Sequence, residues 1–154
     1  MTVTDRPPAE WADGVRIGVD VGTVRVGVAA CDPGGLLASP LTTLARDLRG
    51  GADLDKLARL VAEREAVEVV VGLPRSLSGR SGPAARAARE YAESLAQRIE
   101  PIPVRLSDER LTTVAATRRL AEAGTRGRKG RQVVDRSAAV LILQGWLDAA
   151  RRTS

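Results

Sequence analysis

The sequence predicts an α/β fold in which a five-stranded mixed sheet carries helices on both faces. Two apolar runs at 15–19 and 24–30 are joined by a short turn, and valines alternate in the second, which is typical of a β-hairpin. A Val-rich run at 67–71 lacks strict alternation, which indicates a central strand buried on both faces. Helical patterns then alternate with strands, as in βαβ units.

The first half of the chain supplies the antiparallel part of this sheet. Residues 1–13 hold charges and a Pro-Pro pair without periodicity, so we expect a flexible N-terminal tail followed by a single domain over 14–152. The first three strands are expected at 15–19, 24–30 and 36–44, paired antiparallel. A helix follows from Asp53, as its N-cap, to about Glu65.

The second half supplies the parallel part. We expect a loop from Gly72 to Gly82 after the Val-rich strand, and then a helix from Pro83 to Ile99. The fifth strand is expected at 102–106, followed by a helix at 113–123. Gly124 to Arg131 is a Gly-broken basic segment without an apolar stripe, so we expect it to be mobile. The last helix is expected from Asp135 to Arg151.

Composition narrows the chemistry. The chain has 24 Lys and Arg against 19 acidic residues, a net charge of +5, and only Lys56 and Lys129 are lysines. The guanidinium group of arginine binds phosphate through two parallel hydrogen bonds, so the excess of arginine suits a nucleic-acid partner. The alternative is a compositional bias of the source proteome. There is no histidine and one cysteine, which excludes His-based catalysis and Cys-rich metal sites. We found no long apolar run, so we expect a cytoplasmic protein that does not enter a membrane.

Three carboxylates lie next to the ends of predicted strands or at the start of a predicted helix, where an active site could form. Asp20 directly follows the first strand, and Glu109 follows the fifth; if these strands are parallel and close together, both acids share one rim of the sheet. Asp135 begins the last helix, four residues before Ala139 on its buried stripe, where the helix dipole would favour a carboxylate. Each also has a structural alternative as a hairpin-turn or helix-cap residue. Asp108 fits the capping role better than Glu109.

Three such carboxylates have a direct use. Asp and Glu oxygens bind Mg²⁺ or Mn²⁺ and leave positions for phosphate and water, and two such ions support displacement at a phosphodiester. A bound metal lowers the pKa of its water, so a histidine base is not needed. The sequence therefore favours a divalent-metal nuclease with two ions.

Basic residues near these acids are candidates for phosphate contacts. The segment from Gly124 to Arg131 ends four residues before Asp135 and holds four cations and no acid, so we expect it to act as a phosphate clamp, with a solvated basic loop as the alternative. The candidates for nucleic-acid binding are Arg25, Arg75, Arg110, Arg126, Arg128, Lys129 and Arg131. Cys31 ends the second strand and is expected to pack as an apolar residue; at an exposed edge it would instead link two chains as a homodimer.

Four motifs resemble the YqgF/RuvX family, and they come in the family's order. They are Arg16 to Ala29 (RIGVDVGTVRVGVA), Val71 to Pro74 (VGLP), Asp108 to Thr113 (DERLTT), and Val134 to Leu147. The resemblance implies an RNase H-like fold and metal-dependent nuclease activity. It places Asp20, Glu109 and Asp135 on the family's acidic positions and Arg25 on its first-motif arginine. It also implies maturation of the 5′ end of pre-16S rRNA, with cleavage of branched DNA at Holliday junctions as the alternative.

Two other function classes stay open on sequence alone. The Asp20-Val-Gly-Thr motif also resembles the first phosphate loop of the actin, Hsp70 and sugar-kinase group, which clamps ATP between two such domains. A chain of 154 residues supplies only one. A catalytically silent RNA-binding factor is the second alternative. Ser76 and Ser78 stand where many relatives have Asn and an acid, so no catalytic role carries over to that loop.

Overall fold

The computed structural model describes residues 3–4, 10–74, 82–109 and 128–153, with the side chains of the last range described over 138–152. Its six strands form one sheet in the order β1-β6-β5-β2-β3-β4. The strands are β1 (Val3–Thr4), β2 (Arg16–Val21), β3 (Arg25–Cys31), β4 (Ala38–Ala45), β5 (Glu68–Leu73) and β6 (Val104–Asp108). The described helices are α1 (Ala52–Glu63), α2 (Pro83–Ile99) and α4 (Arg128–Thr153).

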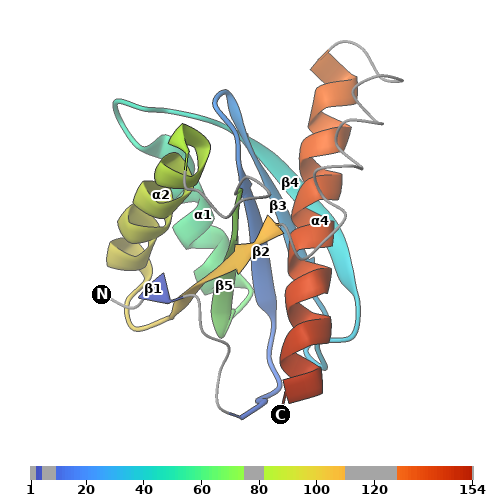
Figure 1. The fold of residues 1–154 in the computed structure, drawn as a ribbon. Coiled ribbons are helices and arrows are strands. Elements are labelled where there is room, and N and C mark those ends of the chain that lie inside the picture. Colours follow the sequence, from blue (N-terminus) through green and yellow to red (C-terminus); the bar gives the residue numbers. More distant parts are fainter. Residues whose placement is uncertain (1–2, 5–9, 75–81, 110–127, 154) are drawn as a thin grey trace.

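The molecule has three layers. Helices α1 and α2 lie on one face of the sheet, and α4 runs along the other face (Figure 1). β2, β3 and β4 pair antiparallel, whereas β2, β5 and β6 are mutually parallel. This confirms the predicted mixed sheet with helices on both faces and the central position of the Val-rich strand, although the sheet has six strands rather than five.

The face beneath α1 and α2 holds the larger core. Alternate residues of the strands, such as Val19, Val71 and Leu106, point into it, and α2 contributes a stripe that includes Tyr91 and Leu95. Pro83 at the start of α2 and the small residues along its stripe explain why its bounds agree with the prediction. On the opposite face, Ala139, Ile142, Leu143, Trp146 and Ala150 of α4 form the expected buried stripe.

Several elements differ from the sequence-based expectation. Val3–Thr4 pairs in parallel with β6, where we expected only a tail; two residues are too few to produce a periodic pattern. α4 begins at Arg128, so the prediction that the basic segment is non-helical is wrong for its last four residues. One glycine costs a helix only about 1 kcal/mol, which the well-packed second half of α4 offsets. The helix expected at 113–123 lies outside the described residues.

The N-terminus of α1 is also built differently from the prediction. Its N-cap is Gly51, and Asp53 lies in the first turn with only 2% of its surface exposed. The Asp47 carboxylate instead accepts the N–H groups of Ala52, Gly50 and Arg49, which lowers the pKa of Asp47 below its usual range. Asp53 is therefore available for contacts with other elements.

A buried ion-pair cluster lies on the α4 face of the sheet, where the parallel strands β2, β5 and β6 begin. Arg16 is 1% exposed, and one of its terminal nitrogens lies 3.4 Å from Glu68, which also accepts from Arg105 at 3.4 Å. The Arg16 guanidinium stacks on Trp11 and also donates to the carbonyl oxygens of Ala12 and Gly14. These contacts fasten residues 11–14 to the domain.

Close contact between α4 and the sheet depends on Gly18. An ideal Cβ at this position would lie 2.6 Å from Leu143 Cβ and 3.0 Å from the Ala139 carbonyl oxygen. These atoms belong to the body of the helix, so a side chain at residue 18 would push α4 away. The glycine within a buried strand thus marks a close approach of two backbones.

We expect Gly18→Ala to lower the free energy of unfolding by about 1–3 kcal/mol, because overpacking forces backbone shifts. Urea denaturation followed by circular dichroism measures this change. Gly82→Ala is the matched control, since an ideal Cβ at Gly82 meets no described atom within 4 Å. A Gly18→Ala protein as stable as the wild type would show that α4 does not rest on this glycine.

Candidate active site

Asp20 lies within β2, one residue before its end, and not in the turn that follows. It is 6% exposed. Its neighbours Val19 and Ile17 pack in the α1/α2 core, so alternation puts Asp20 on the α4 face together with Gly18. Register places it beside Gly72 of β5, since Val19 pairs with Val71.

Glu109 follows β6 and is 7% exposed. Its carboxylate reaches back over β5: the Oε1 atom lies 2.9 Å from the position that a Cβ on Gly72 would occupy. β5 separates β2 from β6, and all three strands are parallel, so the condition for a shared rim is met. Two buried carboxylates therefore flank one glycine on the α4 face.

Gly72 was missed by the sequence analysis, which placed it at the start of a loop. β5 extends through Leu73, so Gly72 belongs to the strand. An ideal Cβ there would lie 2.4 Å from Ile142 Cδ1 of α4 as well as 2.9 Å from the Glu109 oxygen. The glycine thus leaves the space between the sheet and α4 that the Glu109 carboxylate uses. A glycine inside a buried strand was the available signal.

Asp108 lies away from this pair. It pairs with Leu73, whose side chain belongs to the α1/α2 core, so strand alternation puts Asp108 on the face opposite to Glu109. The structure thus places Asp108 and Glu109 on opposite faces of the sheet, which the sequence alone could not decide.

The third predicted acid, Asp135, belongs to α4, but its side chain lies outside the described set. Because α4 begins at Arg128, Asp135 lies about two turns inside the helix. The dipole argument made for it from sequence is therefore wrong, since that effect is confined to the first turn. Its spacing from Ala139, which is fully buried against the sheet, is one helical turn.

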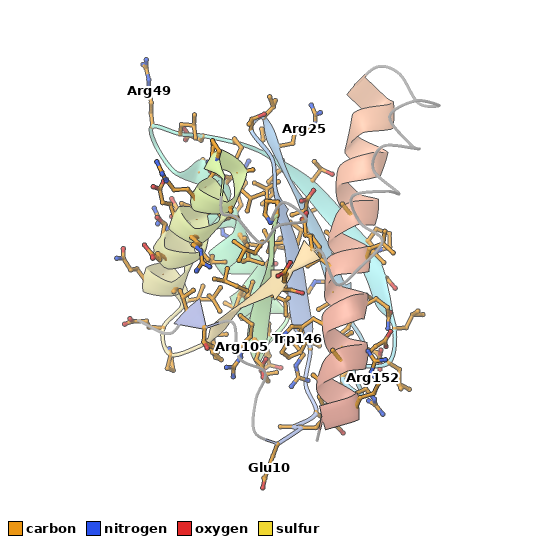
Figure 2. All side chains as sticks on the ribbon, viewed as in Figure 1. Glu10, Arg25, Arg49, Arg105, Trp146 and Arg152 are labelled. Atoms are coloured by element: carbon orange, nitrogen blue, oxygen red, sulfur yellow. The ribbon has the colours of Figure 1, made fainter. Side chains whose placement is uncertain are left out.

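Arg25 begins β3 on the same face as Asp20. Asp20 pairs with Gly27, and Arg25 lies two residues from Gly27 toward the hairpin turn. Figure 2 shows Arg25 and Arg49 at the same end of the molecule, opposite to Glu10. The other predicted nucleic-acid contacts have side chains outside the described set: Arg75, Arg110, Arg126, Arg128, Lys129 and Arg131.

Cys31 is buried at the opposite end of β3 from this region. It is 7% exposed, and its sulfur accepts the N–H of Arg16 at 3.2 Å. Burial raises the pKa of the thiol above its usual range, so the unreactive protonated form is favoured. This confirms the expected apolar packing, and the alternative of an exposed Cys31 linking two chains is wrong.

The donor set beside Gly72 suits a hard divalent cation. Carboxylate oxygens are the ligands that Mg²⁺ and Mn²⁺ prefer, and two buried carboxylates on one side of a sheet are stabilised by a cation. Within residues 10–74, 82–109 and 138–152, no group of three His, Cys, Asp or Glu side chains is close enough to hold a metal.

Comparison with known proteins adds to this geometry. The RuvX family model, described as "Holliday junction resolvase", matches residues 14–149. The chain belongs to the RuvX family. Proteins named "Putative pre-16S rRNA nuclease" resemble this RuvX-family chain closely: that of Frankia casuarinae is 67% identical over 89% of this chain and 68% of its own length. That of Mycobacterium ulcerans is 59% identical over 90% of this chain and 81% of its own length.

Two solved structures of RuvC share the fold of the RuvX-family chain. RuvC of T. thermophilus in complex with a Holliday junction substrate superimposes with a TM-score of 0.54 at 15% identity, over 91% of this chain and 97% of RuvC. A second Thermus thermophilus RuvC structure gives a TM-score of 0.53 at 14% identity. At such identities the likeness concerns the fold alone. Among the described helices, none has the length and apolar character needed to cross a membrane.

Proposed function

We propose that this chain is a divalent-metal-dependent nuclease that hydrolyses phosphodiester bonds in the maturation of the 5′ end of pre-16S rRNA. The observation that carries the proposal is the pair of buried carboxylates, Asp20 and Glu109, on either side of Gly72. Membership of the RuvX family and the names of its relatives support the substrate. Such a substrate implies work in the cytoplasm.

In this proposal Asp20, Glu109 and Asp135 hold Mg²⁺ or Mn²⁺, two ions in all. Bound there, the metal supplies a Lewis acid and an acidified water. Asp135 joins from α4, whose buried stripe rests on the same face of the sheet. The chain's own contribution is to fix the carboxylates within a shielded space where they can act as ligands.

Arg25 has the second role, which is to bind the substrate backbone. It lies on the α4 face beside Asp20, toward the open end of the sheet. A guanidinium there neutralises a phosphate adjacent to the one that reacts, and so positions the strand without holding the metal. The same role is proposed for the cations of 126–131.

The matching family model and the fold of RuvC favour a second candidate, cleavage of four-way DNA junctions. One experiment separates the two. A pre-16S rRNA fragment, a four-way DNA junction and linear duplexes are each incubated with Mg²⁺ or Mn²⁺ and with EDTA. An Asp20→Asn protein, purified in parallel, controls for contaminating nucleases.

We expect site-specific cleavage of the rRNA fragment that needs the metal and is absent from the Asp20→Asn protein. Cleavage confined to the junction would replace the rRNA assignment with the second candidate. Binding of RNA without turnover, under every metal condition, would contradict the nuclease proposal and leave a binding factor in ribosome assembly.

A further inference from the structure

The turn between β2 and β3 is held by an arginine from outside the hairpin. Arg46, the first residue after β4, donates its main-chain N–H to the Val24 carbonyl at 2.9 Å and its Nη1 to the Gly22 carbonyl at 2.7 Å. Within the turn, the Gly22 N–H donates to the Arg25 carbonyl at 2.9 Å. One residue thus binds two carbonyl oxygens of a four-residue turn.

Arg46 is itself held by contacts with α1 and α2, the two helices on the face of the sheet opposite to α4. Its Nε lies 3.8 Å from the buried Asp53 carboxylate of α1, and its guanidinium carbon lies 5.2 Å from the centre of the Tyr91 ring of α2. Asp53 also accepts the Tyr91 hydroxyl at 3.0 Å and the Asp47 N–H at 3.2 Å. Because burial raises the pKa of Tyr91, its hydroxyl stays a donor across the neutral range.

This chain of contacts ends beside the candidate site. Asp20 precedes Gly22 by two residues, and Arg25 directly follows Val24. Both residues project from strands whose relative position is set at this turn. The contacts therefore run from α2 and α1 through Arg46 to the proposed metal ligand and the proposed phosphate contact.

We infer that Arg46 is a positioning residue for the metal site, acting through the β2–β3 turn. The inference rests on the proposed function, since it takes Asp20 as a metal ligand. A loosened turn must be ordered again when the metal binds, so the loss of the Arg46 contacts weakens metal affinity more than it slows the reaction at saturating metal.

Arg46→Met tests this, because methionine keeps an apolar contact with Tyr91 and the main-chain N–H, and removes every side-chain donor. We expect the Mg²⁺ concentration for half-maximal cleavage to rise about tenfold, and the rate at saturating Mg²⁺ to return close to the wild-type value. Calorimetric titration with Mn²⁺ should show the same weakening without any substrate. Circular dichroism without metal shows whether the variant is folded, and so separates this result from a general loss of structure.

Arg98→Met is the matched control. Arg98 lines the same cavity of about 320 Å³ as Arg46, and it pairs with the exposed Asp55 at 3.1 Å. Arg98 contacts Asp55 of α1 and the Ser94 carbonyl of α2 rather than the turn, so the metal requirement should stay at the wild-type value. Arg46→Lys and Tyr91→Phe carry the test if Arg46→Met does not fold. Lysine offers one donor group where arginine serves both Gly22 and Asp53, so we expect an intermediate shift.

Equal Mn²⁺ affinity and equal Mg²⁺ requirement in the wild type and the Arg46 variants would overturn the inference. If the wild type cleaves none of the substrates but binds Mn²⁺ in a way that Asp20→Asn abolishes, only the proposed activity fails. The calorimetry still decides the role of Arg46 in that case. If the wild type shows no Asp20-dependent Mn²⁺ binding, both proposals fail.

Discussion

Asp20→Asn and Glu109→Gln are each expected to lower the cleavage rate at least about a thousandfold, because ligands of one metal centre act as a unit. Each substitution keeps the shape of the side chain and removes the charge that holds the cation. Both residues are buried beside Gly72, so water cannot replace the lost ligand freely. Asp135→Asn should behave in the same way if α4 supplies the third ligand.

The measurement is single-turnover cleavage of the substrate that the wild type cleaves, with circular dichroism to confirm folding. Asp108→Asn is a demanding control, because Asp108 is adjacent to Glu109 in sequence and lies on the opposite face of the sheet. It should retain most of the activity. Near-wild-type rates in Asp20→Asn and Glu109→Gln would remove the basis of the metal site.

Gly72→Ala is expected to reduce the cleavage rate about a hundredfold while the protein stays folded. A methyl group there would lie 2.9 Å from Glu109 Oε1 and 2.4 Å from Ile142 Cδ1, so both side chains must move. A displacement near 1 Å of a group that positions the reacting atoms is enough for a loss of this size. The cost in stability should be about 1–3 kcal/mol, as for other overpacked sites.

The double variant Gly72→Ala with Ile142→Val separates the two contacts. Valine removes the Ile142 Cδ1 atom that the new methyl would meet, so the free energy of unfolding should recover in part. The rate should stay low, because the Glu109 carboxylate is still displaced. Ile142→Val alone serves as the reference. A rate that recovers together with stability would show that the defect passes through α4 and not through Glu109.

The sequence predicted those elements whose pattern is local. β5 was predicted because a Val-rich run is recognisable within a few residues. α2 was predicted from its apolar stripe at helical spacing, and Pro83 marks its first residue. The start of α4 was missed because Gly130 and its basic neighbours resemble a linker, and only the packed half of the helix carries an apolar stripe. β1 is a strand through its pairing with β6, and its two residues carry no local pattern.

The site was predictable in part for the same reason. Asp20 and Glu109 each follow or end an apolar strand, and parallel strands bring such residues to one rim. The geometry between them depends on β5 as the intervening strand and on the absence of a side chain at Gly72. Neither is a local property of the sequence around the acids.

Arg46 could not be found from the sequence, because its partners come from three separate segments. The turn at Gly22, the start of α1 at Asp53 and the middle of α2 at Tyr91 meet only in the folded chain. Sequence analysis instead assigned Asp53 to a cap, which is the local role of an aspartate at a helix start. Long-range contacts of this kind override the local preference.

The two outer strands of the sheet bear on edge-to-edge pairing between copies of the chain. An open β-edge is a template for pairing with another chain, and aggregation follows when it is long and flat. Here β6 is covered over its first residues by the short β1, and β4 carries Pro40, which has no N–H to offer a neighbouring strand. Removal of Val3 and Thr4 would uncover β6, so the residues most easily dismissed as a tail help to keep the sheet from growing between molecules.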